Sequence, residues 1–197
     1  MKNIYVPIEV SARHMHVTQE LVDKLFGNNY QIKPEKMLSQ PGQFAAKETV
    51  EVLGPKNSLM VRIIGPVRKQ NQLEISITDS YFLGIEKPKI RNSGDLINTT
   101  GGVWLKGPKG KVNIENGVII ADRHLHIEPK MACKYGLKNG DFVDIQVDTD
   151  RPLIFQKVLV RSNENIDKLS FQIDTDEANA ADISKKTKGK IIKIYNE

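Results

Sequence analysis

The stretch Ser11-Ala12-Arg13-His14-Met15-His16-Val17 returns in the second half of the chain as Ala121-Asp122-Arg123-His124-Leu125-His126-Ile127. In both places an apolar run typical of a strand precedes the motif. A short helix signal ending in glycine follows it, and a hairpin signal comes next. A repeat of this length, with the same elements around it, predicts two similar half-structures in one chain. Each half is expected to present one Arg-His-x-His motif.

The two halves continue in parallel after the hairpin signals. Each leads to an arginine, Arg68 or Arg161, and then to a strand that is expected to end near Thr78-Asp79 or Thr175-Asp176, followed by a helical segment. Turn signals are frequent and the apolar runs between them are short. Short, regularly spaced strands with few helices are typical of β-barrels and β-sandwiches.

Several elements can be placed by their local signals. Residues 59–64 read as a strand. A hairpin is expected between residues 111–115 and 118–121, because the intervening Asn116-Gly117 tolerates the positive φ angles of a two-residue turn. Another hairpin is expected between residues 141–147 and 153–160. Helices are expected from Thr18 as N-cap to Phe26, from Pro129 to a stop at Gly136, and across residues 176–184.

Composition excludes several classes of protein. The 197 residues carry 29 basic and 24 acidic side chains, a net charge of +5, with only 6% aromatic residues. Single-stranded nucleic-acid binding needs a basic groove with stacking aromatics, and no basic run contains them in series. The densest run, Lys185 to Lys193, reads as a solvated face beside a last strand. We therefore expect no nucleic-acid partner.

No apolar stretch approaches the roughly 20 residues of a membrane span, and the first residues lack the apolar core of a signal peptide. One cysteine, Cys133, excludes an internal disulfide. It lies on an expected short helix with no histidine base adjacent in sequence, and is expected to be a small buried core residue. The chain is expected to be cytoplasmic and to have no membrane partner.

All four histidines of the protein sit in the two His-x-His pairs. In an extended strand, positions i and i+2 point to the same face. His14 and His16 can therefore converge on one ion, and so can His124 and His126. The alternative for each pair is a set of partly buried, hydrogen-bonded histidines. Two histidines do not complete a zinc site, so further ligands must come from elsewhere in the chain.

Further motifs resemble one known family over residues 6–182. They include Leu38-Ser39-Gln40-Pro41-Gly42-Gln43-Phe44-Ala45, Gly65-Pro66-Val67-Arg68-Lys69-Gln70, Leu73-Glu74-Ile75-Ser76, Arg91-Asn92-Ser93-Gly94-Asp95-Leu96 and Ile173-Asp174-Thr175-Asp176-Glu177-Ala178-Asn179-Ala180. With the two Arg-His-x-His motifs, they resemble the phosphate propanoyltransferase family, the PduL-type phosphotransacylases. The resemblance implies a mostly β fold: two pseudo-symmetric β-barrels capped by short helices, with the N-terminal strand joining the C-terminal barrel. We expect one barrel from residues 1–20 with 112–197, and the other from residues 21–111.

The resemblance also implies roles for individual residues. It assigns one metal, which also meets the thiol of coenzyme A, to His14, His16 and Glu74. It assigns a second metal to His124 and His126, and phosphate binding and catalysis to Arg68. Positions that match the polar lining of the family's site are Ser11, Gln40, Gln43, Gln72 and Arg161.

The chain departs from the family pattern at Gln172, where relatives usually carry a third histidine. An amide oxygen is a weaker zinc ligand than an imidazole nitrogen. One tightly bound Zn²⁺ and a second, more weakly held ion are therefore expected. Glu74 and Gln172 are candidates for related places in the two halves, although the intervening lengths differ.

The implied activity is reversible transfer of a propanoyl or acetyl group between coenzyme A and inorganic phosphate. Metal- and arginine-bound phosphate would attack the thioester directly. Two alternatives stay open: a metal-dependent thioesterase or other hydrolase, and a catalytically weakened metal-binding paralogue. An acyl kinase is the expected functional partner, and a homodimer is compatible with the chain. Because the first expected strand begins within about five residues of Met1, no N-terminal microcompartment-targeting helix is expected.

Overall fold

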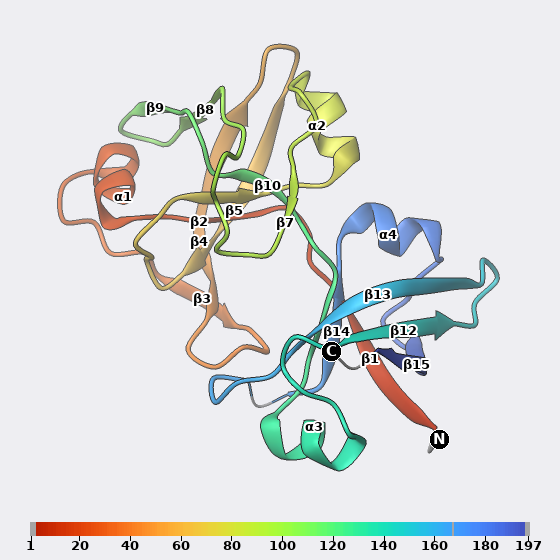
Figure 1. Ribbon diagram of the computed structural model, residues 1–197. Helices are drawn as coiled ribbons and strands as arrows, with labels where there is room; N and C mark the ends of the chain where they lie inside the picture. Colours follow the sequence, from red (N-terminus) through yellow and green to blue (C-terminus); the bar gives the residue numbers. More distant parts are fainter. Residues whose placement is uncertain (1–2, 167, 196–197) are drawn as a thin grey trace. The chain divides into compact units, whose positions relative to one another are not determined.

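The computed structural model describes residues 3–166 and 168–195, which form two compact units (Figure 1). One unit joins the chain up to Ser11 with the chain from Arg123 onward, and the other runs from Ala12 to Asp122. The barrel boundaries expected from the sequence, at residues 20/21 and 111/112, stay a prediction. No helix in the described part of the chain is long and apolar enough to cross a membrane.

The first unit is a closed six-stranded barrel with the strand order β1-β14-β11-β13-β12-β15. Its strands are β1 (Ile4–Val10), β11 (His124–His126), β12 (Phe142–Val147), β13 (Leu153–Arg161), β14 (Ser170–Ile173) and β15 (Lys188–Tyr195). Strand β1 pairs in parallel with β14 and antiparallel with β15, so it closes the barrel. The prediction that the N-terminal strand joins the C-terminal barrel is confirmed.

Alternation along the strands explains how this barrel fills its interior. In β1, Val6 and Ile8 are buried and Tyr5 is exposed, as a period of two requires. The buried residues pack with Phe171 and Leu125 of the neighbouring strands into one apolar core. The predicted hairpin of residues 141–147 and 153–160 is confirmed, since β12 and β13 pair antiparallel.

The second unit is a nine-stranded half-barrel sheet with an apolar core of its own. Its strand order is β7-β10-β6-β2-β5-β4-β8-β9, and β3 pairs with β4 outside this path. The strands are β2 (His14–His16), β3 (Pro34–Met37), β4 (Phe44–Leu53), β5 (Ser58–Gly65), β6 (Gln72–Glu74), β7 (Ile90–Arg91), β8 (Val103–Lys106), β9 (Lys111–Ile114) and β10 (Val118–Ala121). The mostly β fold predicted from the sequence is confirmed, and this half of it is a curved open sheet.

The hairpin predicted across Asn116-Gly117 is wrong, although both of its strands exist. Strand β9 pairs with β8, and β10 runs parallel to β6 and β7. Gly117 takes a φ of 91° and lies so close to Asn71 that a Cβ would meet its carbonyl oxygen at 2.4 Å. The Gly117 carbonyl then accepts a hydrogen bond from Leu73 N, which starts β10 beside β6. A tertiary contact therefore overrides the local turn signal.

The described part of the chain has four short helices after strands: α1 (Gln19–Phe26), α2 (Ile77–Leu83), α3 (Pro129–Tyr135) and α4 (Thr175–Ala180). The predicted limits of α1 are confirmed: Thr18 Oγ1 accepts a hydrogen bond from Leu21 N, and Gly27 ends the helix. Helix α3 begins at Pro129 and ends at Gly136, as predicted. Helix α4 ends four residues before the predicted end at 184, since Asp182 takes a φ of 50°.

The strands expected to end near Thr78-Asp79 and Thr175-Asp176 stop earlier, at Glu74 and Ile173. Ser76 and Asp174 are the N-caps of α2 and α4, and each completes a capping box with the residue three positions later. These caps satisfy backbone N–H groups of the first helical turn, so the helix begins immediately after the strand.

Candidate metal centre

Strand β2 places His14 and His16 between two partner strands of the second unit. It runs parallel to β5 and antiparallel to β6, so that His14 lies opposite Glu74 and His16 opposite Gln72. Met15, between the two histidines, is fully buried in the apolar core. The period of two therefore directs both imidazoles to the face of the sheet away from the core, as the sequence predicts.

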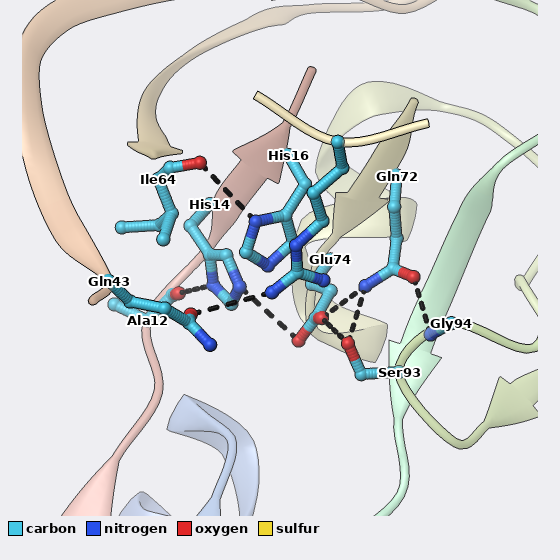
Figure 2. Close-up of polar contacts among 10 residues, drawn as sticks. Ala12, His14, His16, Gln43, Ile64, Gln72, Glu74, Ser93 and Gly94 are labelled. Carbon is cyan, nitrogen blue, oxygen red and sulfur yellow. Dashed lines mark hydrogen bonds and ion pairs between the residues drawn. The ribbon is translucent and has the colours of Figure 1, made fainter. Parts of the chain in front are cut away.

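The two imidazoles meet the Glu74 carboxylate in a tight cluster (Figure 2). His14 Nε2 lies 3.5 Å from Glu74 Oε2, and the two imidazole centroids are 5.1 Å apart. The ligand atoms of His14, His16 and Glu74 all lie within 4.8 Å of one another. Among the residues that the structure describes, they form the only group of three or more such side chains that could hold a metal ion.

Backbone carbonyls fix the orientation of both imidazoles. His14 Nδ1 lies 3.0 Å from the Ala12 carbonyl oxygen, and His16 Nδ1 lies 3.3 Å from the Ile64 carbonyl oxygen. A carbonyl oxygen only accepts, so each Nδ1 must carry the proton. In the neutral imidazole the lone pair is then on Nε2. Metal-binding histidines almost always donate their other N–H in this way.

Glu74 is buried and held by two donors on one of its oxygens. Oε1 accepts hydrogen bonds from Ser93 Oγ at 2.9 Å and from Gln72 Nε2 at 2.5 Å. Gln72 Oε1 in turn accepts from Gly94 N at 2.7 Å. These bonds leave Oε2 facing His14. Sequence reasoning did not assign Ser93 or Gly94 to the site, although both lie in the 91–96 motif, because their role depends on which strand end that loop reaches.

The cluster carries opposing charges that shift each pKa. Burial raises the pKa of Glu74, but the charge of His14 and the hydrogen bonds from His14 and Ser93 outweigh this and hold that pKa well below its usual range. Burial lowers the pKa of His16 to about 3, assisted by the charges of His14 and Arg68. For His14, burial is outweighed by Glu74, so its pKa is raised. An ionised Glu74 and a neutral His16 are what a cation requires of these two ligands, and a bound cation would displace the proton that Glu74 favours on His14.

Arg68 lies in the loop after β5, close enough for its charge to act on both histidines. Its backbone N–H donates to the Val17 carbonyl at 2.8 Å, and its Nη2 donates to Gln43 Oε1 at 3.4 Å. Burial lowers the pKa of Arg68, an effect opposed by the nearby Glu74 carboxylate. Of the predicted site residues, Gln43, Gln72 and Arg68 therefore lie with the triad.

Gln40 lies in the turn that leads into β4. Its described hydrogen bonds are local: its side-chain oxygen accepts from Ser39 Oγ at 3.3 Å, and its carbonyl accepts from Gln43 N at 3.1 Å. Gln40 therefore supports the backbone of Gln43, and the structure shows no hydrogen bond from Gln40 to the triad among the described residues.

The donor set of the triad fits zinc. Two imidazole nitrogens and one carboxylate oxygen are typical of catalytic zinc sites, which keep a fourth position open for water or substrate. His16 and Glu74 are buried and His14 is half-buried, the Nδ1 atoms of both histidines face carbonyl oxygens, and the carboxylate is supported by Gln72 and Ser93. These features are what a pre-organised metal site needs.

The second histidine pair lies in the barrel on β11. His124 is opposite Gln172 and His126 is opposite Ser170 on β14, with the imidazole centroids 4.6 Å apart. The register is the same as in the other unit, where His14 faces Glu74 and His16 faces Gln72. Gln172 therefore holds the place of Glu74 in its own half. The sequence could only suggest this relation, because the segments between motif and partner strand differ in length.

Arg161, at the end of β13, lies opposite His126. Burial lowers the pKa of His126 to about 4, and the Arg161 charge adds to this effect. In the other unit, the residue that lies opposite His16 is Ile64. Arg161 and Arg68 therefore do not occupy equivalent positions in the two units. Ser11 belongs to the barrel, where its N–H donates to the Ile173 carbonyl at 2.8 Å.

Cys133 is exposed on α3. The expectation that it is a buried core residue is wrong, because the short helix turns Ala132 inward instead, at 3% exposure.

The fold and the site together define a class of β protein with two halves, each with a His-x-His strand. In one half, two histidines and a carboxylate converge beside an arginine in an arrangement that could hold a metal ion.

The family model described as phosphate propanoyltransferase matches residues 7–184. The chain is 51% identical to the phosphate propanoyltransferase of Thermotoga maritima over 176 residues, 88% of this chain and 82% of that protein. It is 47% identical to the one of Alkaliphilus metalliredigens over 95% of this chain and 88% of that protein. It is 42% identical to the one of Clostridioides difficile over 98% of this chain and 91% of that protein.

The chain belongs to the phosphate propanoyltransferase family, and it is an enzyme of the acyltransferase class. The resemblance drawn from its motifs is thereby confirmed.

Proposed function

We propose that this protein catalyses reversible transfer of a short acyl group, propanoyl or acetyl, between coenzyme A and inorganic phosphate. The observation that carries the proposal is the converging triad of His14, His16 and Glu74 with Arg68 beside it, in a chain of this family. The products in one direction are an acyl phosphate and free coenzyme A.

The reaction requires a phosphate oxygen to attack the thioester carbonyl carbon. A C–O bond forms, the C–S bond breaks, and the sulfur leaves as a thiolate. Phosphate is strongly hydrated, so it must be bound, partly desolvated and aimed. The carbonyl oxygen and the departing sulfur both gain negative charge, and fixed positive charge at these atoms lowers the barrier.

Arg68 is the residue that we assign to phosphate. Its planar guanidinium can donate two parallel hydrogen bonds to phosphate oxygens, which fixes orientation as well as charge. Gln43 accepts from its Nη2, and Val17 holds its backbone. These two contacts position the guanidinium at the triad before phosphate arrives.

We assign one Zn²⁺ to His14, His16 and Glu74, and a second, more weakly held Zn²⁺ to the half with His124 and His126. When bound, zinc would supply Lewis-acid stabilisation of the developing charge and an affinity for the thiolate sulfur. Gln72 and Ser93 keep the Glu74 carboxylate ionised and oriented. Gln40, Ser11 and Arg161 remain proposed lining residues for the substrates.

The transfer is proposed to be direct, in a complex that holds both substrates. A covalent route needs an activated nucleophile beside a base. The sole thiol, Cys133, is exposed on α3 of the barrel unit and has no histidine beside it in the sequence. The acyl phosphate is a high-energy mixed anhydride, and an acyl kinase is the proposed consumer of it.

The test is coenzyme A release from acetyl-, propanoyl- and butanoyl-CoA by zinc-loaded protein, with and without phosphate. Release that requires phosphate, with acyl phosphate trapped as its hydroxamate, is the expected result. Equal release without phosphate would identify a thioesterase instead. No release under either condition, in zinc-loaded and folded protein, would identify a paralogue that has lost catalysis.

A further inference from the structure

The His124–His126 half contains an amide–carboxylate pair that the proposed function does not use. Gln172 Nε2 donates to Glu9 Oε2 at 2.5 Å and to Ser170 Oγ at 3.1 Å. The other half contains the same kind of pair, in which Gln72 Nε2 donates to Glu74 Oε1 at 2.5 Å. In each half, therefore, an amide on the strand that pairs with the His-x-His strand holds one oxygen of a carboxylate.

We propose that Glu9 supplies the carboxylate ligand of the second zinc site, with His124 and His126, and that Gln172 holds this carboxylate and does not itself bind the ion. The inference rests on the second metal of the proposed function. It deepens that function by naming the residue that takes the place of the missing third histidine.

The register of the barrel places these side chains in one row. Glu9 on β1 is the partner of Gln172 on β14, and Gln172 is the partner of His124 on β11. The residues next to them, Ile8 and Phe171, point into the barrel core. By the period of two, Glu9, Gln172 and His124 therefore share the outer face of the barrel.

The span along this row suits a shared ion. Two strand spacings of about 4.8 Å separate the Cα atoms of Glu9 and His124. A glutamate and an imidazole, each about 2 Å from a zinc ion, can bridge that distance. Among the described residues, the ligand atoms of Glu9, His124 and His126 do not converge as those of the first triad do, so the Glu9 carboxylate must turn toward the histidines when the ion binds.

Charge favours Glu9 over Gln172 as the ligand. A carboxylate oxygen is an ordinary zinc ligand, whereas the neutral amide leaves the ion's double charge uncompensated. Arg161 adds a further positive charge beside His126 and lowers the pKa of that imidazole, whereas the charge of Glu9 raises it. Both N–H bonds of Gln172 already point to Glu9 and Ser170. Hydrogen bonding of this kind is what supports a ligating carboxylate.

The test is zinc affinity of the second site, measured by chelator competition and by metal analysis after dialysis. Glu9→Gln is nearly isosteric and removes only the charge. Glu164→Gln, at an exposed position of the same unit, is the matched control. Loss of a hydrogen bond to a ligand costs about 10–100-fold in metal affinity, so loss of the ligand itself should cost at least tenfold. Glu9→Gln should weaken the second zinc by that factor, leave the first zinc in place, and leave the circular dichroism spectrum unchanged.

Adding Gln172→His to Glu9→Gln should restore the second zinc, because a third imidazole replaces the lost carboxylate. Equal second-site affinity in Glu9→Gln and Glu164→Gln would overturn the inference. So would a wild-type chain that binds one zinc even with metal in excess. The phosphate-dependent assay is read separately: zinc-replete wild type that transfers no acyl group would overturn the proposed function, while the affinities would still decide the role of Glu9.

Discussion

Glu74 is a buried carboxylate whose ionised form depends on its neighbours. An isolated buried charge is strongly unfavourable unless it is paired and hydrogen-bonded. Here Ser93, Gln72 and His14 supply these partners, and the same arrangement leaves Oε2 turned toward the histidines. Core packing alone does not require a buried, ionised carboxylate with these three polar partners.

We expect His14→Ala and Glu74→Gln each to lose the tightly bound zinc and at least a hundredfold in turnover, which corresponds to about 2.7 kcal/mol of transition-state stabilisation. The apolar core of the unit does not include either side chain, so the fold should persist. Metal analysis, turnover and circular dichroism on the same preparations check this. Undiminished zinc in both variants would show that the ligand assignment is wrong.

Arg68→Ala should raise the Michaelis constant for phosphate more than that for acyl-CoA, because the guanidinium is assigned to phosphate alone. Arg68→Lys should recover only part of the loss, since an ammonium offers a point charge in place of a planar fork. Steady-state kinetics with each substrate varied in turn measure the two constants. A similar change in both constants would contradict a phosphate-specific role.

His16 should make the zinc-free protein sensitive to mild acid. Its pKa is lowered to about 3 by burial and by the charges of His14 and Arg68. Between about pH 6.5 and pH 3, His16 therefore binds a proton in the unfolded chain but not in the folded protein. The contribution of His16 to the free energy of unfolding is fully present above pH 6.5 and is lost as the pH falls. The pKa of His14 is raised, so His14 acts in the opposite direction.

The measurement is the free energy of unfolding of zinc-free protein at pH 7 and pH 5, from denaturant titration. In His16→Asn the decrease between these pH values should be smaller than in wild type by roughly 1–2 kcal/mol, at 1.36 kcal/mol per pKa unit. An identical decrease in both proteins would mean that His16 is protonated as readily in the folded state as in the unfolded chain.

At the scale of elements, the arginine of each Arg-His-x-His motif forms an ion pair with the helix that follows the neighbouring strand. Arg13 pairs with α2 after β6, and Arg123 pairs with α4 after β14. Arg13 donates from Nη2 to Asp79 Oδ1 at 2.6 Å and from Nε to both carboxylate oxygens at 3.0 Å. Arg123 Nη1 donates to Glu177 Oε1 at 2.8 Å. Asp79 and Glu177 are the N3 residues of the capping boxes of α2 and α4. In each half, therefore, the ion pair with the arginine and the helix cap share one carboxylate.

Arg13→Ala should therefore destabilise the protein more than Arg123→Ala. The Asp79 side chain is 5% exposed, so removing its partner leaves a buried charge and should cost about 1.5–3 kcal/mol. The Glu177 side chain is 23% exposed, and a pair with this access to solvent contributes about 1 kcal/mol or less. Denaturant unfolding of both variants tests the order. A larger loss for Arg123→Ala would contradict it.

The sequence predicts elements well where the deciding interactions are local. Thr18, Gly27, Pro129 and Gly136 mark helix ends because capping and backbone conformation act within a few residues. It fails at residues 111–121, where Asn116-Gly117 is a sound hairpin signal. The deciding contact there is between Gly117 and Asn71, which no local pattern reveals.

At the scale of the whole molecule, the repeated motif predicts two halves and the two histidines of the candidate metal centre, while Glu74 comes from the resemblance to the family. The motif does not reveal the hydrogen bond of Ser93 to Glu74, which depends on where a loop lies, nor the hydrogen bond between Gln172 and Glu9. Strand register supplies what spacing cannot, because β14 lies between β1 and β11 although these strands are far apart in the chain. The homodimer and the cytoplasmic location stay predictions.

The central claim is that acyl transfer to phosphate takes place at the His14–His16–Glu74 centre with Arg68. The most direct measurement is acyl phosphate formation from propanoyl-CoA, followed by phosphorus NMR while zinc is titrated into metal-free protein. We predict that acyl phosphate appears only when zinc and phosphate are both present, rises as the first equivalent of zinc binds, and is absent in His14→Ala. Acyl phosphate formed at the same rate without zinc, or by His14→Ala as fast as by wild type, would contradict the account.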